Sequence, residues 1–598
     1  MTAWRLVYGA TVLPEGGVEF RVWAPRVRAM SVRIEGSRHR EHAMDREGED
    51  FHAVVKNARS GEYYSYVLDD KADRSDPVSR SQPEGVHGPS QIVDPNGFAW
   101  SDSDWRGIPL RDYIIYELHV GTFTPEGTFE ATIARLPYLK ELGITAVELM
   151  PVGEFPGNRN WGYDGVDIYA PQSTYGGPLG LKKLVNACHE TGLAVALDVV
   201  YNHFGPEGNY LGEFGPYFTD HYKSPWGDAI NFDGPGADGV RRLIIDNALY
   251  WLTEYHIDAL RLDAIHAIYD FSAQHVLHEL ADCFRDQAAR LGRQAFTIAE
   301  SDLNDVRVIA PREAGGYGLD AQWLDDFHHA VFGVLTGNRR GFLRDFGHIA
   351  DICKALRDGY VIDGVWSAYR QRRFGNSSKD RPGEHFVAFL ENHDQVANTS
   401  EGLRLAARVS FEEQKLAAAI LLCAPYVPLL FMGQEFSDPA PFLYFTSHTD
   451  PELARAVSEG RKKEYGDFAT AGEGVYEDPQ SQRAFGKSKL SWTAIDAAPH
   501  SAMLRLYRDL IALRKNQPAL SNCRRDLTCV AVDENARTLT MERSDPFGPS
   551  ALLLCNFGEE HRPGPDSLWR LAIATGAPEY GGHLPPGAPG TAAIYTRG

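Results

Sequence analysis

The chain has 598 residues and a formal net charge of −21, because 81 Asp and Glu residues outnumber 60 Lys and Arg residues. This excess of negative charge repels phosphate backbones and anionic lipid, so it argues against nucleic acid or a membrane as the main partner and favours a neutral ligand. Hydrophobic residues make up 43% of the chain and charged residues 24%, which indicates a folded globular protein and excludes a disordered one.

The cysteines and the apolar segments indicate the compartment. The 7 cysteines are an odd number with neither a disulfide framework nor a CxxC metal pattern. The first residues lack the apolar core of a signal peptide. The longest apolar run, residues 416–432, contains two prolines and is shorter than the about 20 residues that a membrane span needs, so we expect a buried helix followed by a buried strand. We therefore expect a reduced, cytoplasmic protein.

The first hundred residues are short alternating strands separated by turns. Residues 18–23 alternate apolar and polar side chains before Pro25, and residues 62–67 repeat the pattern. We expect an N-terminal antiparallel β-sandwich over residues 1–100. Residues 94–104 are rich in turn-forming residues and predict a linker.

From about residue 111 the pattern changes to strand, loop and helix. Apolar residues at helical spacing predict one helix from Ile133 to Leu142, which Gly143 ends. We expect eight buried strands at residues 113–118, 146–150, 194–200, 259–263, 296–300, 321–324, 385–390 and 427–431. Eight such units over about 390 residues predict an α/β fold, a (β/α)8 TIM barrel, over residues 101–490.

Two long loops interrupt the predicted barrel, and a further region follows it. One insertion, at about residues 203–238, is rich in Gly, Pro and aromatic residues and follows the third strand; another, at about residues 359–384, precedes the seventh. Short strands such as residues 551–557 return near the end of the chain. We therefore expect residues 491–598 to form a C-terminal region that ends in an antiparallel β-domain.

The ends of the predicted strands carry many polar residues. The third strand runs into Asn202-His203, the fourth contains Arg261 and Asp263, and the fifth ends at Glu300, while Asp394 follows the seventh. In a TIM barrel the carboxyl ends of all strands meet at one mouth, where catalytic residues lie. Asp263, Glu300 and Asp394 are therefore expected around one pocket. Glycoside hydrolases use two carboxylates that flank the bond to be cleaved.

These strand-end segments resemble the motifs of the α-amylase superfamily, and the resemblance covers nearly the whole chain. It implies that Asp263 is the nucleophile, Glu300 the acid/base and Asp394 the transition-state stabiliser. The resemblance also implies roles around the sugar in subsite −1: Arg261 holds Asp263 ionised, His203 and His393 donate hydrogen bonds, and Tyr163 is a stacking platform.

Structural alternatives stay open for the less certain positions. A single Asp at a strand end is often a cap or turn residue, and Asp198 and Asn202 could only tie down the insertion loop. Trp161 and Tyr163 could be core aromatics. His266 could contact the ligand, or it could be a structural histidine at the barrel rim whose hydrogen bonds are made within the protein.

Within the superfamily, the motif at residues 21–25 resembles branching enzymes, isoamylases and the members that release trehalose from maltooligosyltrehaloses. Residues 323–329, Gln395 in place of Glu, and residues 441–448 resemble the last subgroup. By that resemblance six further residues line the sugar subsites: Asp325, Asp326, His328, His329, Gln395 and Asn398. We expect the two aspartates to point into the barrel mouth, with the two histidines on a short turn beyond.

The implied reaction is hydrolysis of the α-1,4 bond next to the terminal trehalose of a maltooligosyltrehalose, with retention of configuration. The partner is a neutral α-glucan oligosaccharide, and we expect no cofactor and no metal ion. A glycogen branching or debranching enzyme remains the alternative. A non-catalytic glucan-binding protein is the alternative of another class, and the intact Asp263, Glu300 and Asp394 argue against it. The oligomeric state stays open.

Overall fold

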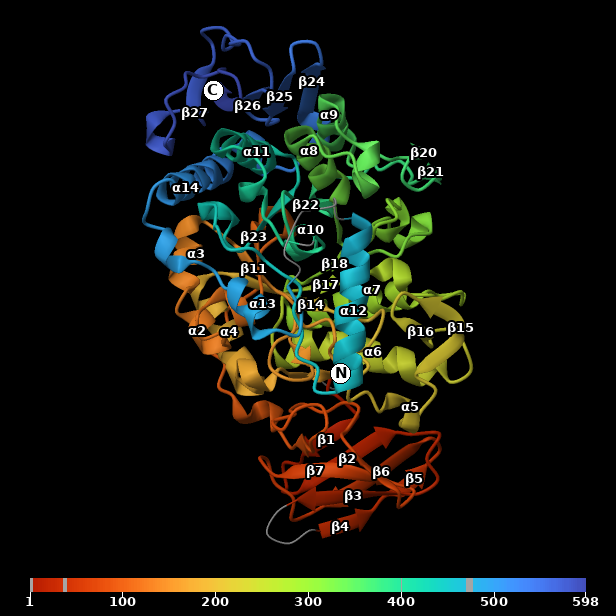
Figure 1. Cartoon of the computed structure of the whole chain (residues 1–598). Helices are drawn as coiled ribbons and strands as arrows, with labels where there is room; N and C mark the ends of the chain where they lie inside the picture. The colour runs from red at the N-terminus through yellow and green to blue at the C-terminus, as the bar shows by residue number, and fades with distance from the viewer. Residues whose placement is uncertain (1–3, 36–39, 400, 469–476, 598) are drawn as a thin grey trace.

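The structure is a computed structural model that describes residues 4–35, 40–399, 401–468 and 477–597. Two antiparallel sheets lie at one end of the molecule, a barrel lies in the middle, and a further antiparallel sheet lies at the other end (Figure 1). The first sheet has the order β1 (Gly9–Val12), β2 (Val18–Trp23), β6 (Asp50–Val55), β5 (Asp45–Glu47). The second has the order β4 (Arg40–Ala43), β3 (Met30–Glu35), β7 (Tyr63–Leu68), β8 (Ala72–Arg74), with β9 (Ser90–Gln91) also paired to β7.

The central unit is a closed barrel of parallel strands. Its strands in order are β10 (Ile115–Leu118), β11 (Ala146–Leu149), β14 (Ala194–Val199), β17 (Ala259–Leu262), β18 (Phe296–Ala299), β19 (Ala321–Trp323), β22 (Phe386–Phe389) and β23 (Val427–Phe431). Nearly every residue of these strands is buried, as expected when helices cover the outside of a parallel sheet. The predicted fold class, a TIM barrel with β-structure on either side, is confirmed.

Helices surround this barrel. The longer ones are α4 (Gly177–Thr191), α6 (Ala237–Glu254), α7 (Val276–Leu291), α8 (Asp325–Thr336), α9 (Ile349–Asp358) and α11 (Phe411–Cys423). The single helix expected from Ile133 to Leu142 is instead two helices, α2 (Phe129–Ile133) and α3 (Leu136–Leu142). Pro137 in the first turn of α3 explains the break, because proline has no N–H to continue a preceding helix.

The run 416–432 forms the buried helix and strand that its sequence predicts, α11 and β23. Ser410 and Glu413 form a capping box at the start of α11. Every residue of this helix from Lys415 to Cys423 is buried, and the helix packs against the C-terminal sheet. No helix in the described ranges combines the length and the apolar character needed to cross a membrane.

The two expected insertions carry their own short elements. The first contains α5 (Leu211–Phe214) and the hairpin β15 (Phe218–Ser224) and β16 (Gly227–Ile230). The second contains the hairpin β20 (Val365–Ser367) and β21 (Arg372–Phe374). Short helices α1 (Val120–Phe123) and α10 (His393–Ala397) follow β10 and β22, and α12 (Pro451–Phe468) and α13 (Gln482–Lys487) come after β23.

The C-terminal region begins with helices and ends in one sheet. Helices α14 (His500–Asn516) and α15 (Pro518–Ser521) precede a five-stranded antiparallel sheet. Its order is β24 (Thr528–Asp533), β25 (Thr538–Ser544), β26 (Ser550–Asn556), β28 (Thr591–Arg597), β27 (Arg570–Ala574).

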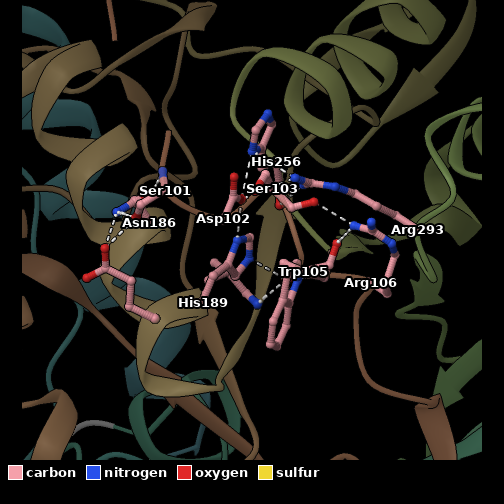
Figure 2. A network of polar contacts seen from close by, with 12 residues as sticks. Ser101, Asp102, Ser103, Trp105, Arg106, Asn186, His189, His256 and Arg293 are labelled. Atoms are coloured by element: carbon pink, nitrogen blue, oxygen red, sulfur yellow. Dashed lines mark hydrogen bonds and ion pairs between the residues drawn. The ribbon is translucent and has the colours of Figure 1, made fainter. Parts of the chain in front are cut away.

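The turn-rich segment at residues 94–104 is anchored to the barrel by a buried charge network. Figure 2 shows Asp102 among His189, His256 and Arg293. Oδ2 of Asp102 lies 2.7 Å from His189 Nδ1, 2.8 Å from His256 Nδ1 and 3.1 Å from Arg293 Nη2. The other ring nitrogen of His189 lies 2.9 Å from Asp258 Oδ2. The segment expected to be a linker is therefore fastened to α4 and to the loops beyond α6 and α7.

Aromatic rings complete this network, which we call the Asp102 cluster (Asp102, His189, His256, Asp258 and Arg293). Trp105 stacks on His189 with ring centroids 4.6 Å apart, and its indole N–H donates to Asp258 Oδ1 at 2.7 Å. The cluster lies at the amino-terminal ends of the barrel strands, since Asp258 immediately precedes β17. It is therefore at the opposite end of the barrel from the strand ends that carry the candidate site.

Candidate active site

Arg261 lies at the centre of the candidate site. It is the third residue of β17, where alternate side chains point into the barrel, and its side chain is fully buried. Its Nη1 lies 2.8 Å from Asp198 Oδ2 and 2.7 Å from Asp263 Oδ1, and its Nη2 lies 3.0 Å from Glu300 Oε2. One guanidinium thus contacts carboxylates from the ends of three adjacent strands, β14, β17 and β18, as the barrel order requires.

The backbone after β17 turns sharply to complete this arrangement. Ala264 has φ +37, a left-handed conformation that a residue with a side chain seldom adopts. This turn directs the Ala264 N–H to Glu300 Oε2, at 2.7 Å. Glu300 is therefore held by a backbone donor on one side and by Arg261 on the other. Asp263 and Glu300 thus contact the same guanidinium from adjacent strand ends.

Tyr163 and His393 link the Arg261 cluster to the end of β22. The Tyr163 hydroxyl donates to Asp198 Oδ2 at 2.6 Å and lies 2.8 Å from His393 Nε2. The two rings are stacked, with centroids 5.2 Å apart. Gly162 permits this approach: it has φ +108, and a Cβ there would lie 2.1 Å from the carbonyl oxygen of Pro151.

Burial and nearby charges set the protonation of these groups. Burial raises the pKa of Asp198 above its usual range, although Arg261 opposes the effect. Burial alone would lower the pKa of His393, but Asp394 and Glu117 outweigh it and raise the pKa to about 9. His393 is therefore charged at neutral pH.

Asp394 is the most accessible of the three proposed carboxylates, with 32% of its side chain exposed. It lies in the first turn of α10, and its Oδ2 is 3.6 Å from His393 Nε2. The Asn398 amide donates to its other oxygen at 3.1 Å. Asn398 thus reaches the site as a partner of Asp394, while Gln395, also on α10, is half-buried.

His203 is in place beside Tyr163 but differs from the expectation in one respect. Burial lowers its pKa to about 4, so the ring is neutral and has a single N–H. That N–H is on Nε2, which lies 3.1 Å from the Tyr163 carbonyl oxygen, an atom that can only accept. His203 therefore has no N–H left to donate to a sugar, as long as this contact is kept. Its ring stacks on Trp226, at the turn of the β15–β16 hairpin.

The residues after β19 are arranged differently from the expectation. The expected turn does not form, because α8 begins directly at Asp325, so both histidines are inside the helix. The Asp326 carboxylate points into the protein: its Oδ2 accepts from Asn304 Nδ2 at 2.9 Å and from the Val361 and Ile362 N–H groups at 2.7 and 2.9 Å.

His328 is also turned away from the barrel mouth. It is buried, and its Nδ1 lies 2.6 Å from the carbonyl oxygen of Leu390. Burial lowers its pKa to about 4. The contacts of Asp326 and His328 are thus with the chain itself, and they correct the expectation that these side chains line the sugar subsites.

Asp325 and His329 are closer to the candidate site. Burial and the charges of Glu300, Asp302 and Asp394 raise the pKa of Asp325 well above its usual range. His329 packs against Phe342 with the two rings tilted, and it shares a small cavity with Asp325 and with the Asp302–Arg370 ion pair, whose atoms are 3.0 Å apart.

His266 borders a much larger cavity. It lies just beyond β17, with Nδ1 4.0 Å from Asp302 Oδ1. The cavity has a volume of about 740 Å³ and is lined mainly by residues 265–278 and 301–317, the segments that follow β17 and β18. Tyr269, Phe271 and Tyr317 are among its lining residues.

Several residues of the site were not predicted. Trp323 packs its ring against the Arg261 guanidinium, 4.1 Å from the ring centre, and Glu117 contacts His393. A charged residue inside the buried run 113–118 is a signal that could have identified Glu117. Arg370 and Trp226 lie in insertion loops, where the pattern of the sequence does not indicate which side chains reach the site.

The sequence leaves Asn202 open as a structural residue, and the structure shows it buried. Neither of its amide atoms has a hydrogen-bond partner among the described residues. Within those residues, no group of three His, Cys, Asp or Glu side chains is arranged to hold a metal ion.

Family comparisons agree with this geometry. The family described as "Alpha amylase, catalytic domain" matches residues 91–226, and "Carbohydrate-binding module 48 (Isoamylase N-terminal domain)" matches residues 7–86. The chain is 38% identical to a Salmonella typhimurium protein described as an alpha amylase, whose crystal structure matches with a TM-score of 0.90 and full coverage of both chains. A pullulanase from Anoxybacillus sp. LM18-11 shares the fold at 20% identity, with a TM-score of 0.70 over 100% of this chain and 88% of that one.

Relatives over nearly the full length define the family more narrowly. The malto-oligosyltrehalose trehalohydrolase of Saccharolobus solfataricus is 48% identical over 84% of this chain and 86% of its own. That of Mycobacterium tuberculosis is 42% identical over 91% of this chain and 93% of its own. A 1,4-alpha-glucan branching enzyme of Thiobacillus denitrificans is 27% identical, over 94% of this chain and 74% of its own. The chain therefore belongs to the malto-oligosyltrehalose trehalohydrolase family of the α-amylase superfamily.

Proposed function

We propose that this protein hydrolyses the α-1,4-glucosidic bond next to the terminal trehalose of a maltooligosyltrehalose and releases trehalose. One observation carries the chemistry: Arg261 contacts both Asp263 and Glu300, at 2.7 and 3.0 Å. Two carboxylates that share one guanidinium can act on the same bond. The names of the full-length relatives support the choice of substrate.

The proposed mechanism is a double displacement. Asp263 attacks the anomeric carbon while Glu300 protonates the leaving glycosidic oxygen, which gives a covalent glycosyl-enzyme and free trehalose. Water then attacks the glycosyl-enzyme with Glu300 as base, so configuration is retained. Retaining enzymes hold their two carboxyl groups about 5–5.5 Å apart, and we propose this spacing for Asp263 and Glu300.

Asp394 and the Tyr163–His393 pair complete the proposed subsite −1. Asp394 is exposed enough to approach the sugar ring, and its negative charge would stabilise the oxocarbenium-like transition state. Tyr163 would form the platform, because its hydroxyl and one ring face are held by Asp198 and His393.

The leaving trehalose must lie on the Glu300 side of the scissile bond, because Glu300 protonates its oxygen. The 740 Å³ cavity is lined by the residues just beyond Asp263 and Glu300, including His266 and Ser301. We therefore assign the leaving-group side to this cavity and to the neighbouring Asp302, Asp325 and Arg370. Polar side chains there that hydrogen-bond to trehalose, and have no partner when maltose takes its place, would give the selectivity for trehalose over maltose.

We further propose that the protein works in the reducing cytoplasm. All 7 cysteines are free in the structure, and five of them are buried, which fits a chain that needs no disulfide.

One assay separates this function from the alternatives. The purified protein is incubated in parallel with a maltooligosyltrehalose, amylose and glycogen, and products are followed by chromatography and by NMR of the anomeric protons. We expect free trehalose from the first substrate, with the new reducing end appearing as the α-anomer. New branches in amylose, or debranching of glycogen without trehalose release, would overturn the proposal in favour of a branching or debranching enzyme.

A further inference from the structure

Glu117 is a buried carboxylate on the barrel strand β10, in contact with His393. We propose that Glu117 is a positioning residue that holds His393 as an imidazolium cation and, through it, fixes Tyr163 and Asp394 in subsite −1. The inference rests on the proposed function for the role of that subsite, but the charge of His393 is a separate and measurable property.

Both ring nitrogens of His393 lie beside an oxygen that can accept a hydrogen bond, which favours a proton on each of them. Nδ1 lies 2.5 Å from Glu117 Oε1, and a carboxylate oxygen accepts this proton. Nε2 lies 2.8 Å from the Tyr163 hydroxyl, whose own hydrogen goes to Asp198 Oδ2 at 2.6 Å. Arg261 Nη1 lies 3.0 and 2.8 Å from the two oxygens of Asp198 and 3.4 Å from the Tyr163 hydroxyl, and its charge favours the ionised form of Asp198, the form that accepts the Tyr163 hydrogen. In this arrangement the Tyr163 oxygen accepts from His393 Nε2.

Glu117 also fixes the backbone of the segment. Its second oxygen, Oε2, accepts a hydrogen bond from the backbone N–H of His393, with the oxygen and nitrogen 3.1 Å apart. The carboxylate therefore contacts both the ring and the main chain of His393. Such two-point contact sets both the position and the tilt of the imidazole. Since Tyr163 stacks on that ring, the Glu117 carboxylate determines where the Tyr163 platform lies.

The other charged and titratable groups around His393 come from several elements. They are His119 beyond β10, Glu148 on β11, Tyr163, Asp198 on β14, Arg261 on β17 and Asp394 on α10 itself. Burial lowers the pKa of His119 to about 3, so that ring is neutral. Arg261 opposes a positive charge on His393, whereas Asp394 supports it. The charge therefore depends on Glu117 and Asp394 together.

Glu148 is the natural control for this proposal. It is paired in register with Glu117 on the adjacent strand and is equally buried. Neither of its carboxyl oxygens has a hydrogen-bond partner among the described residues. Burial and the charge of Glu117 raise its pKa well above the usual range, which favours its uncharged form. Of these two adjacent glutamates of the barrel interior, Glu117 is the one in contact with His393, so Glu148→Gln changes a buried carboxyl nearby and leaves that contact in place.

The direct test is the protonation state of His393 in the wild-type protein. Protein labelled with ¹⁵N in its histidine rings is measured by NMR between pH 5 and 8, and His393 is assigned as the resonance missing from His393→Gln. We expect ¹⁵N shifts of a doubly protonated ring across this range. A neutral imidazole at pH 7 would overturn the proposal, and this readout requires neither enzymatic activity nor a Glu117 variant that folds.

The kinetic test compares Glu117→Gln, Glu117→Asp and Glu148→Gln with the wild type on maltooligosyltrehalose. In Glu117→Gln we expect kcat to fall about tenfold at pH 5 and about a hundredfold at pH 8, with KM changed less than threefold, because His393 loses its proton as the pH rises. Glu117→Asp should restore most of the loss at pH 8. Glu148→Gln should keep the wild-type profile.

The pH dependence separates positioning from a general structural role. If the ratio of wild-type to Glu117→Gln kcat is constant with pH, or if Glu148→Gln shows the same rising ratio, the proposal is wrong. If the wild type releases no trehalose, the proposed function fails instead, and the NMR result still decides the charge of His393.

Discussion

The Nη1 atom of Arg261 lies 2.7 Å from Oδ1 of Asp263, two residues further along the chain. Residues two apart in an extended chain face the same side, and Asp263 directly follows β17, so the strand brings the two side chains together. Asp198 contacts the same nitrogen from the neighbouring strand. The proposed nucleophile is thus oriented by groups that are themselves buried and fixed, which is the arrangement expected of a preorganised site.

Asp263→Asn and Glu300→Gln should each remove nearly all hydrolysis, because each replaces a carboxylate that the double displacement needs. The measurement is kcat on maltooligosyltrehalose, with circular dichroism to show that each variant folds. Asp282→Asn on α7, whose side chain is 34% exposed, is the control and should behave as wild type. A variant that keeps more than about a tenth of kcat, a barrier increase below about 1.4 kcal/mol, would contradict the role assigned to that residue.

Arg261→Lys should lower kcat strongly although the positive charge is kept. A lysine ammonium is a single point charge, whereas the planar guanidinium contacts Asp198, Asp263 and Glu300 and packs on Trp323. We expect kcat to fall about a hundredfold, which corresponds to about 2.7 kcal/mol in the barrier. Arg285→Lys, a half-exposed arginine on α7, should have no effect. Activity of Arg261→Lys within threefold of wild type would show that charge alone suffices.

The barrel and its strand ends could be predicted because both follow from local patterns. Buried runs separated by amphipathic segments give the strands, and the closed barrel then brings residues 263, 300 and 394 to one mouth whatever the loops do. The catalytic roles of these three carboxylates came from the resemblance to a known superfamily, whereas their expected proximity came from the geometry of the barrel.

The remaining contacts depend on packing that local patterns do not encode. Residues 325 and 326 are both aspartate, so the sequence does not distinguish them. Which of the two side chains points into the protein depends on the start of α8 at Asp325. Asp102 stands in a turn-rich segment, and its burial depends on His189 and Arg293, which are far away in sequence. Side chains in the two insertions, such as Trp226, are placed by loop conformations that the spacing of residues does not determine.

Asp102→Asn should lower stability, and the size of the loss should depend on pH. Burial alone would lower the pKa of His189, but its hydrogen bonds to Asp102 and Asp258 outweigh this and raise the pKa above 6.5. Its stabilising contribution is therefore complete below pH 6.5 and is lost as the pH rises through the higher pKa of the folded state. Burial alone would raise the pKa of Asp102, but hydrogen bonds from His189 and His256 lower it, so its contribution is present above pH 3.8 and is lost as the pH falls.

The measurement is the free energy of unfolding in urea for wild type and Asp102→Asn from pH 4 to pH 9. We expect Asp102→Asn to lose about 3 kcal/mol near pH 6, as for a broken buried ion pair, and the difference to shrink toward pH 9. Lys183→Gln on the same helix as His189 is the control: its side chain is half-exposed and its ion pair to Glu130 is 3.9 Å long, so it should change stability by less than about 0.5 kcal/mol. A difference that grows from pH 6 to pH 9 would contradict the assigned charge of His189.

Asp325 and Asp326 should have separate effects on specificity and on stability. Asp326 accepts three hydrogen bonds from Asn304, Val361 and Ile362, so Asp326→Ala leaves buried donors unsatisfied. We expect it to lower the free energy of unfolding by about 3 kcal/mol and to change kcat/KM for maltooligosyltrehalose and for plain maltooligosaccharide by equal factors. Asp325 instead lies within the influence of Glu300, Asp302 and Asp394, on the proposed leaving-group side.

Asp325→Ala should therefore keep most of the stability and lose selectivity. A buried polar group can hydrogen-bond to a trehalose hydroxyl that has no equivalent on maltose. When maltose is bound, that protein group has no hydrogen-bond partner, so maltose is bound less well than trehalose. We expect the loss of transition-state stabilisation, calculated from kcat/KM, to be about 2–3 kcal/mol on maltooligosyltrehalose and less than about 1 kcal/mol on maltooligosaccharide. The two rates are measured by trehalose release and by reducing-end release. Equal losses on both substrates would place Asp325 in the glucose subsite that the two share. The selectivity would then depend on Arg370 in the 359–384 insertion, where Arg370→Lys is the next variant to measure.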